Sequence, residues 1–525
     1  MTASVTPPAE VGARPGRSIV SMPSRLFGRG ARVAASWSAE ERDAVLYAAA
    51  ALFAIITAQG SSIALYQQWG RLAVGPYALG AVASAVAACR ARRRADAAAA
   101  SSAGGGTPMH DASPTWHWTT SRTVIFLVVF VGATLGPLAL EVLWQTDSGG
   151  TSHVQPEALV VEGSGARLAH GKPLYRDIDG HHERVSAPPG QPAYDVYNPY
   201  LPLMSLFGLP SSTSAPRRLT DARVAFSLIT ILVVVAALAM CRGPSGPRVL
   251  ALQSMTVFPT AALPLATGGD DVPIAALLLL GLVLMQRRRP LAAGVVLGIA
   301  SSMKITAWPL AFLALLVATD RSGHRGRRPT LWLAAGLAGV MIPSILPTFV
   351  GDPAAFIDNV VRFPLGLAGI TSPASSPLLG HAIVSWFPGI HRLFTAMVAI
   401  VGGLLLLFVL IRHTPRSPAD LARLLGWVML IAILVAPATR IGYLLYPVDF
   451  FIWAWLLRSE ERVSTLPLPV EEVAEPPPLE VESLSGRQSS SVTANSLIVN
   501  AVVSSAARDP DPNAVGATVT PSSHS

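Results

Sequence analysis

The chain has 525 residues, of which 51% are hydrophobic and only 13% are charged, with a net charge of +8 and a mean hydropathy of +0.47. This composition excludes an ordinary soluble globular domain, and several uncharged stretches of about 15–23 residues are long enough to cross a bilayer as helices. The positive charge does not indicate a nucleic-acid partner, because the arginines are grouped beside the apolar stretches, where the positive-inside rule places them.

The N-terminal part of the chain predicts a tail followed by a helical hairpin. Residues 1–43 are rich in Ala, Pro, Ser and Arg, which is typical of a disordered tail, here placed in the cytoplasm. We expect helices at about 44–66 and 72–89 and then an Ala/Gly/Ser-rich linker up to residue 118. Cys89 and Cys241 both lie at predicted cytoplasmic helix ends, so no disulfide is expected.

Residues 119–457 predict an all-α transmembrane core. A helix at about 123–143 leads into a long polar loop at 145–221, and a second polar loop is expected at 351–391. Residues 458–525 predict another disordered cytoplasmic tail. About twelve transmembrane helices are expected in all. Those after the first loop are placed near 223–241, 249–267, 272–286, 291–303, 305–319, 331–350, 393–411, 422–438 and 441–457.

Arginine groups indicate how these helices are oriented. The groups lie at residues 242–248, 287–289, 321–328 and 412–423. All of them face the cytoplasm only if residues 291–319 form a hairpin of two short helices instead of one long span. Lys304 then lies at the outward tip of this hairpin, both loops face outward and both termini are cytoplasmic.

The first outer loop contains the main catalytic candidate. Its residues 157–170 place Ala158, Val161, Gly165 and Leu168 on one helical stripe, which predicts a short helix lying in the membrane interface. Glu157 begins that helix. An acidic residue there is favoured by the helix dipole alone, so the residues by themselves favour an ordinary helix-start charge over a general base.

Three sequence motifs resemble a known family. The first is Gly171, Pro173 and Tyr175 in GKPLY, the second is YNPYLP at residues 197–202, and the third is GGDDVPIAALLLLGLVLMQRRRPLAAGVVLGIASSMKITAWP at residues 268–309. Over about residues 120–457 the chain resembles the polyprenol-phosphate-dependent mannosyltransferases of the GT-C class, especially glycosyltransferase family 87 and its uncharacterised relatives. Residues 1–118 and the C-terminal tail lie outside the resemblance.

The resemblance implies a reaction and a base. In the family an acidic residue about fourteen positions before the motif glycine acts as general base. Here that residue is Glu157, although the family usually has aspartate, and Asp147 and Glu141 are the fallback candidates. The implied reaction is inverting transfer of a hexose, mannose in the family, from a polyprenyl-phosphate donor to a glycolipid or glycan acceptor. It takes place at the outer face of the plasma membrane and needs no metal or other cofactor.

Other polar residues are candidates for substrate binding. Four of them also have an ordinary structural explanation: Lys304 as a snorkelling lysine, Arg440 as the cap of the last span, and Asp270 and Asp271 as helix-start acids. The prolines at 199, 202 and 210 are interpreted as stiffeners of the chain, a structural role that suits them better than Asn198 or Tyr200. The full set of predicted substrate-binding residues is Asp147, Asn198, Tyr200, Asp270, Asp271, Lys304, Arg440 and Tyr443. The run DIDGHHE at residues 177–183 contains metal-ligating residue types, but it lacks the calcium-loop spacing and is interpreted as a solvated loop.

Two further functions stay open at this point. Broken helices and intramembrane charge also suit a transporter or flippase for a lipid-linked or anionic substrate, although we find no internal repeat. A non-catalytic membrane scaffold, embedded in the membrane lipid, would use the two disordered tails as its functional parts. The family resemblance favours the enzyme.

Overall fold

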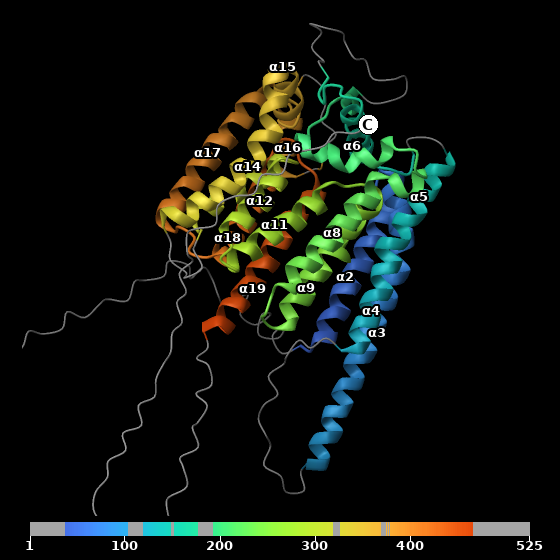
Figure 1. The fold of residues 1–525 in the computed structure, drawn as a ribbon. Coiled ribbons are helices and arrows are strands. Elements are labelled where there is room, and N and C mark those ends of the chain that lie inside the picture. The colour runs from blue at the N-terminus through green and yellow to red at the C-terminus, as the bar shows by residue number, and fades with distance from the viewer. Residues whose placement is uncertain are drawn as a thin grey trace, which may run out of the picture. The chain divides into compact units, whose positions relative to one another are not determined.

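The computed structural model describes residues 37–102, 119–148, 152–176, 193–318, 326–368, 374, 376 and 378–465 (Figure 1). The chain divides into the units Met1–Leu466 and Pro467–Ser525, and every described residue lies in the first. All regular secondary structure in these ranges is helical, which confirms an all-α multi-pass membrane protein. Most of both predicted tails, most of the linker and the run at 177–183 lie outside the described residues.

The N-terminal hairpin consists of α2 (Ala39–Gly60) and α3 (Ala64–Ser102). The first helix begins earlier than predicted, because Ser38 and Glu41 form a capping box. It also ends earlier, since the chain turns at residues 61–63. The second helix extends to Ser102, well past the predicted end at 89, because its Ala- and Arg-rich second half has high helix propensity.

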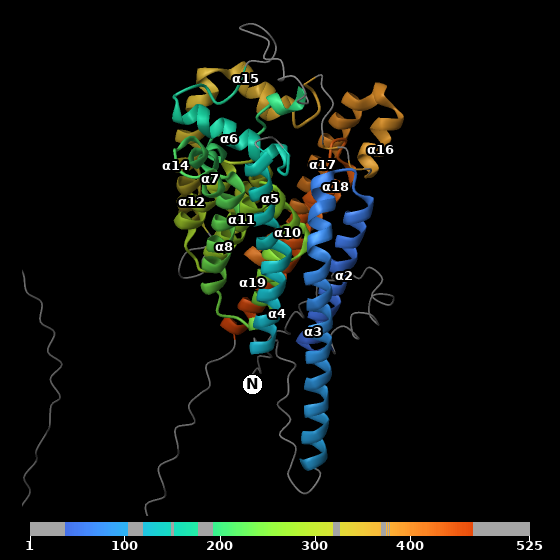
Figure 2. The same cartoon turned by 90° about the vertical axis from the view of Figure 1, so that its right-hand side faces the viewer.

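The hairpin is packed onto the core through hydrogen bonds from buried aromatic residues. The continuous helix made of α4 (Thr120–Phe130), the π-helical turn η1 (Val131–Leu135) and α5 (Gly136–Ser148) lies against α3 (Figures 1 and 2). Trp69 Nε1 donates to the Ala133 carbonyl at 3.0 Å. The Tyr77 hydroxyl donates to the Val257 carbonyl, directly after α9 (Ser245–Thr256), at 2.6 Å. The hairpin is therefore an integral part of the bundle.

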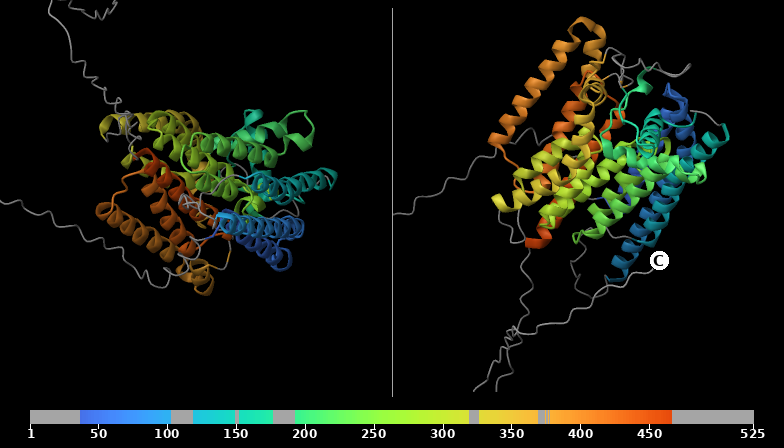
Figure 3. Two further views of the ribbon diagram at one scale, coloured as in Figure 1. Left: turned by 90° about the horizontal axis from the view of Figure 1, so that it is seen from below. Right: turned by 45° about the horizontal axis from the view of Figure 1, so that its top comes forward.

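Among the described residues, eight helices are long and apolar enough to span a membrane, and three further apolar helices are shorter. These eleven helices and α19 (Leu445–Thr465) lie at the positions of the twelve or so predicted transmembrane helices, but only eight of them have the length and hydropathy of a membrane span. The centre of the bundle is α11 (Asp271–Gln286), whose residues from Val272 to Met285 are almost all buried. At the edge, α17 (His391–Arg412) buries only Phe394 (Figure 3). The remaining core helices are α8 (Ala222–Ala239), α9 (Ser245–Thr256), α10 (Pro259–Thr267), α12 (Pro290–Ser301), α13 (Trp308–Leu313), α14 (Arg327–Gly351) and α18 (Pro418–Val435).

The hairpin predicted at 291–319 is confirmed. Helices α12 and α14 run in the same direction, because Gly294 lies against Leu333 and the Ser344 hydroxyl donates to the Ser302 hydroxyl at 2.8 Å. The chain between them must therefore return across the bundle, and it does so through η4 (Ile305–Ala307), α13 and η5 (Ala314–Leu316). A Cβ atom added at Gly294 would lie 2.2 Å from the Leu333 carbonyl oxygen, so only glycine permits this close packing. Lys304 lies at the reversal.

The arginine-rich ends of the helices gather at one end of the bundle, which we name the arginine end. There the Glu460 carboxylate accepts hydrogen bonds from the Arg242 backbone at 2.9 Å and from the Arg287 side chain at 3.0 Å. Asp420 at this end pairs with Arg423 and Arg458. Because α11 runs from Asp271, beside Lys304, to the Arg287 end, Lys304 lies at the opposite end.

The opposite end carries the short helices of the two predicted loops, seen at the top of Figures 1 and 2. They are α6 (Pro156–Ala169), η2 (Ala193–Val196), η3 (Pro202–Ser212), α7 (Arg217–Thr220), α15 (Pro353–Ile357), η6 (Asp358–Arg362), α16 (Leu379–Trp386) and η7 (Pro388–Ile390). The short helix predicted at 157–170 corresponds to α6 and is confirmed as a helix. Its first turn carries Glu157.

Candidate functional site

The start of α6 is fixed to two other helices by Gln155. Its backbone N–H donates to the Thr267 carbonyl, at the end of α10, at 2.8 Å. Its side-chain amide donates to the Thr267 hydroxyl at 2.6 Å and to the Tyr66 hydroxyl, in the first turn of α3, at 2.9 Å. Glu157 follows two positions later, so its place is determined by α3 and α10 as well as by its own helix.

Glu157 forms an ion pair with Arg440, which precedes the short helix η8 (Ile441–Leu444) between α18 and α19. One carboxylate oxygen, Oε1, accepts the hydrogen bond from Arg440. The other, Oε2, is buried and has no hydrogen-bond partner among the described residues. A buried carboxylate oxygen without a partner is costly, which makes it a candidate for contact with a substrate or water. The Glu157 side chain is 15% exposed and that of Arg440 is 31% exposed, so both remain within reach of a ligand.

Lys304 is held by two carboxylates at the start of α11. Its Nζ lies 3.1 Å from Asp270 Oδ1 and 2.7 Å from Asp271 Oδ1. The Tyr446 hydroxyl also donates to Asp271 Oδ1, at 2.7 Å. The Lys304 side chain is only 14% exposed and its ammonium is paired twice, which differs from the arrangement of a lysine that snorkels to solvent.

Aromatic rings surround this lysine and extend its cluster. Lys304 Nζ lies 5.6 Å from the ring centre of Tyr200 and 5.8 Å from that of Tyr443, within the range of cation–π attraction. The backbone next to Tyr200 is hydrogen-bonded to the segment where the chain reverses before Lys304: the Leu201 N–H donates to the Met303 carbonyl at 2.9 Å. The YNPYLP motif therefore positions Lys304 through the backbone.

The Glu157–Arg440 pair and the Lys304 cluster are neighbours and form one site. Glu157 interacts electrostatically with Asp270 and Tyr200, and Arg440 interacts with Tyr443. The five charged side chains of this pair and this cluster are three carboxylates and two cations, and both cations are already paired. An anionic ligand must therefore share Lys304 or Arg440 with the carboxylates. Among the described residues, no three His, Cys, Asp or Glu side chains are grouped so as to hold a metal ion.

Asn198 contacts Asn359 and the backbone of Tyr200. Its backbone N–H donates to Asn359 Oδ1 at 2.8 Å, and its own side-chain oxygen accepts from the Tyr200 N–H at 3.2 Å. Asn359, in the π-helical turn η6, also donates to the Arg176 carbonyl at 3.0 Å. The Asn198 side-chain oxygen thus stabilises the backbone beside the site.

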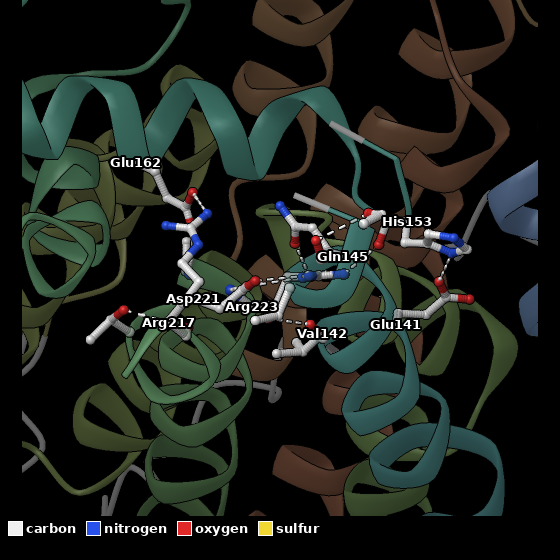
Figure 4. Close-up of polar contacts among 12 residues, drawn as sticks. Glu141, Val142, Gln145, His153, Glu162, Arg217, Asp221 and Arg223 are labelled. Carbon is white, nitrogen blue, oxygen red and sulfur yellow. Dashed lines mark hydrogen bonds and ion pairs between the residues drawn. The ribbon is translucent and has the colours of Figure 1, made fainter. Parts of the chain in front are cut away.

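The fallback carboxylates have partners away from Glu157. Asp147 pairs with Arg218 at 3.6 Å, and both side chains are more than half exposed. Glu141 is fully buried, and His153 Nδ1 lies 3.1 Å from its Oε2 (Figure 4). The structure brings together Glu157, Asp270, Asp271, Lys304, Arg440, Tyr200 and Tyr443 from the predicted set, whereas Asp147 lies beside α7.

A buried arginine supports the segment that leads into α6. Figure 4 shows the Arg223 guanidinium between Gln145, Asp221 and the His153 backbone. Its distance to the His153 carbonyl is 2.6 Å. Further along α6, Glu162 pairs with Arg217. These contacts tie α5, α6 and α8 together and determine where α6 begins.

Three residues of the site were not among the predicted ones: Tyr66, Asp195 and Tyr446. Burial raises the pKa of the Asp195 carboxyl, and the negative charge of Glu157 raises that pKa further, which places Asp195 near Glu157. Tyr446 lies in the same ATRIGYLLYP stretch as Arg440, which is a signal that could have found it. Nothing in the sequence connects Tyr66 or Asp195 to the site.

The comparisons with known proteins bear on this site. Residues 199–437 match the family model described as glycosyltransferase family 87. The resemblance to that family is confirmed over this stretch, and it supports a membrane glycosyltransferase. Tyr200, Asp270, Asp271 and Lys304 fall inside the matched residues, whereas Glu157 and Arg440 lie outside them. A search of curated proteins and a search of solved structures each find no match.

Proposed function

We propose that this glycosyltransferase moves a hexose, specifically mannose, from a polyprenyl-phosphate donor to a glycolipid or glycan acceptor, with inversion. The observation that carries the proposal is Glu157: one carboxylate oxygen is held by Arg440 and the other is buried without a partner among the described residues. Such an oxygen is suited to take a proton from a bound hydroxyl.

In the proposed reaction the acceptor hydroxyl oxygen attacks the anomeric carbon of the donor sugar. The bond between that carbon and the phosphate oxygen breaks, and its electron pair leaves with the polyprenyl phosphate. The acceptor proton moves to Glu157 Oε2. Attack from the side opposite the leaving group inverts the anomeric centre. A phosphate is already a workable leaving group, so positioning and charge stabilisation supply most of the catalysis.

The two halves of the site have different roles in this proposal. Arg440 and Lys304 share their positive charge with the donor phosphate as its negative charge grows. Asp270 and Asp271 accept hydrogen bonds from sugar hydroxyls, because carboxylate oxygens suit that task and Asp270 Oδ2 has no partner among the described residues. We propose that the transfer needs no divalent metal, since the two side-chain cations take that role.

We also propose that the site faces the outside of the plasma membrane. The support is the arginine end, because clustered arginines favour the cytoplasmic side. The termini are then both cytoplasmic, as predicted from the sequence.

The test is transfer by the full chain in nanodiscs supplied with undecaprenyl phosphate mannose and a lipid or glycan acceptor extract. We expect a new mannosylated product, undiminished by EDTA, whose anomeric configuration is opposite to that of the donor. Product that retains the donor configuration would overturn the single-base mechanism. Loss of activity with EDTA that Mg²⁺ or Mn²⁺ restores would overturn metal independence. If no polyprenyl-phosphate sugar is consumed, the donor class is wrong.

A further inference from the structure

The N-terminal hairpin places a tyrosine hydroxyl at the candidate site. The turn at residues 61–63 ends α2 and starts α3, so Tyr66 lies in the first turn of α3, at the same end of the bundle as α6. The hairpin lies outside the residues that match glycosyltransferase family 87. Its contribution to the site therefore comes from a part of the chain that the family model does not cover.

The contacts of Tyr66 show how its hydroxyl is used. Gln155 Nε2 donates to it at 2.9 Å, so the hydroxyl oxygen acts as an acceptor. The same hydroxyl interacts electrostatically with Glu157, Arg440 and Tyr443. Its own O–H has no recorded acceptor among the residues that the structure describes. By contrast, the hydroxyl of Tyr446 already donates to Asp271 within the site.

The charge balance of the site favours a neutral hydrogen-bond donor such as this O–H. Both cations are paired with carboxylates, so a phosphate oxygen that enters the site gains from an additional neutral donor that needs no ion pair to open. Part of the Tyr66 side chain is exposed, whereas Tyr446 is fully enclosed, and the Tyr66 hydroxyl lies in the enclosed surroundings of Glu157 and Arg440.

We propose that Tyr66 is a substrate-positioning residue whose hydroxyl donates a hydrogen bond to a phosphate oxygen of the lipid-linked donor. This inference rests on the proposed function of the site. It makes the N-terminal hairpin a part of the active site, through one side chain held in place by Gln155.

The chain offers a matched control on the same hairpin. The Tyr47 hydroxyl also accepts from a glutamine, Gln253 Nε2, at 3.2 Å. That glutamine also donates to Asp43, the partner of Arg122, in a buried network away from Glu157. Tyr66→Phe and Tyr47→Phe therefore each remove one hydroxyl that accepts from a glutamine, and only the first is beside the site.

The experiment measures binding and turnover in nanodiscs for both variants. For Tyr66→Phe we expect the Kd of undecaprenyl phosphate and the KM of undecaprenyl phosphate mannose to rise by at least ~10-fold, the scale of one hydrogen bond to a charged group. The kcat should change little, because Glu157 stays in place. Tyr47→Phe should leave all three constants unchanged.

Other outcomes overturn the inference in different ways. If Tyr66→Phe leaves Kd and KM at the values of Tyr47→Phe, the hydroxyl does not contact the phosphate, although the proposed function stands. A fall in kcat alone, with Kd unchanged, would make Tyr66 a structural support for Glu157. If the unmodified chain neither binds undecaprenyl phosphate nor transfers mannose from its ester, the proposed function fails and this inference fails with it.

Discussion

Arg440 and Glu157 are 283 positions apart in the chain and form an ion pair at the candidate site. One belongs to the loop before the last helix of the bundle and the other to the first turn of α6. The pair joins a segment near the beginning of the core sequence to one near its end. The proposed base and the proposed phosphate-binding cation are therefore positioned as one unit. Charge-assisted bonds of this kind are stronger and more directional than neutral ones.

Glu157→Gln tests the assignment of the base. Glutamine preserves the size of the side chain and its hydrogen bond to neighbours, but it cannot take the acceptor proton. We expect kcat to fall by ~100-fold or more, the scale of losing a general base, with little change in donor KM. Initial rates with undecaprenyl phosphate mannose measure the effect.

A control on the same helix separates chemistry from structure. Glu162 also pairs with an arginine, Arg217, so Glu162→Gln removes a comparable charge from α6. It should lower the midpoint of thermal unfolding more than it lowers kcat. Asp147→Asn, Asp270→Asn and Asp271→Asn should each be milder than Glu157→Gln. If Asp147→Asn abolishes transfer while Glu157→Gln remains active, the base is Asp147.

Lys304→Met tests the charge balance of the site. The lysine neutralises two adjacent carboxylates, and Asp270 is only 3% exposed. Removing one partner of a buried ion pair costs about 3–5 kcal/mol, because it leaves uncompensated charge. We therefore expect weaker binding of undecaprenyl phosphate together with a lower midpoint of thermal unfolding.

The double variant Lys304→Met/Asp271→Asn distinguishes the two effects. It removes one of the stranded carboxylates, so stability should recover in part while the binding of undecaprenyl phosphate remains weak. Full recovery of binding would show that Lys304 only neutralises Asp270 and Asp271 and does not contact the phosphate.

The sequence predicted the helices and much of the site for identifiable physical reasons. Apolar stretches and arginine groups report directly on spanning segments and their ends, which is why the reversal at Lys304 was found. Contacts between residues that are far apart in the sequence cannot be predicted in this way. The partners of Lys304 and Glu157 come from other helices, and no local pattern shows that Arg440 reaches Glu157 or that Tyr66 reaches Gln155. Helix ends were displaced where caps or propensity outweighed hydropathy, as at Ser38 and in the second half of α3.

Cysteine labelling tests the orientation that the arginine end implies. In a background without Cys89 and Cys241, single cysteines at Ser152 and Ser376 should react with a membrane-impermeant maleimide added to intact cells. A cysteine at Ser322, and a tag at the C-terminus, should react or bind only after permeabilisation. Labelling at position 322 from outside would show that the orientation is the reverse of the proposed one and that the candidate site faces the cytoplasm.

Gly165→Ala tests whether the packing of α6 sets the position of Glu157. Gly165 lies against Gly208 of η3, and a Cβ atom added to it would be 2.2 Å from the Gly208 carbonyl carbon. Backbone atoms cannot move aside as a side chain can, so α6 must shift away from η3. Because Glu157 lies on the same helix, we expect both the unfolding midpoint and kcat to fall. Gly163 provides the matched control, because a Cβ atom added there meets no heavy atom within 4 Å.

Gly163→Ala should keep full activity and stabilise the chain by about 0.5–1 kcal/mol, since alanine loses less backbone entropy than glycine in a helix. The two variants differ by two positions on one helix and carry the same substitution, so helix propensity cancels between them. Thermal unfolding in detergent and transfer rates in nanodiscs give the comparison. If Gly165→Ala retains the kcat of Gly163→Ala while its unfolding midpoint falls, α6 adjusts without moving Glu157, and the position of the base depends on Gln155 and Arg440 alone.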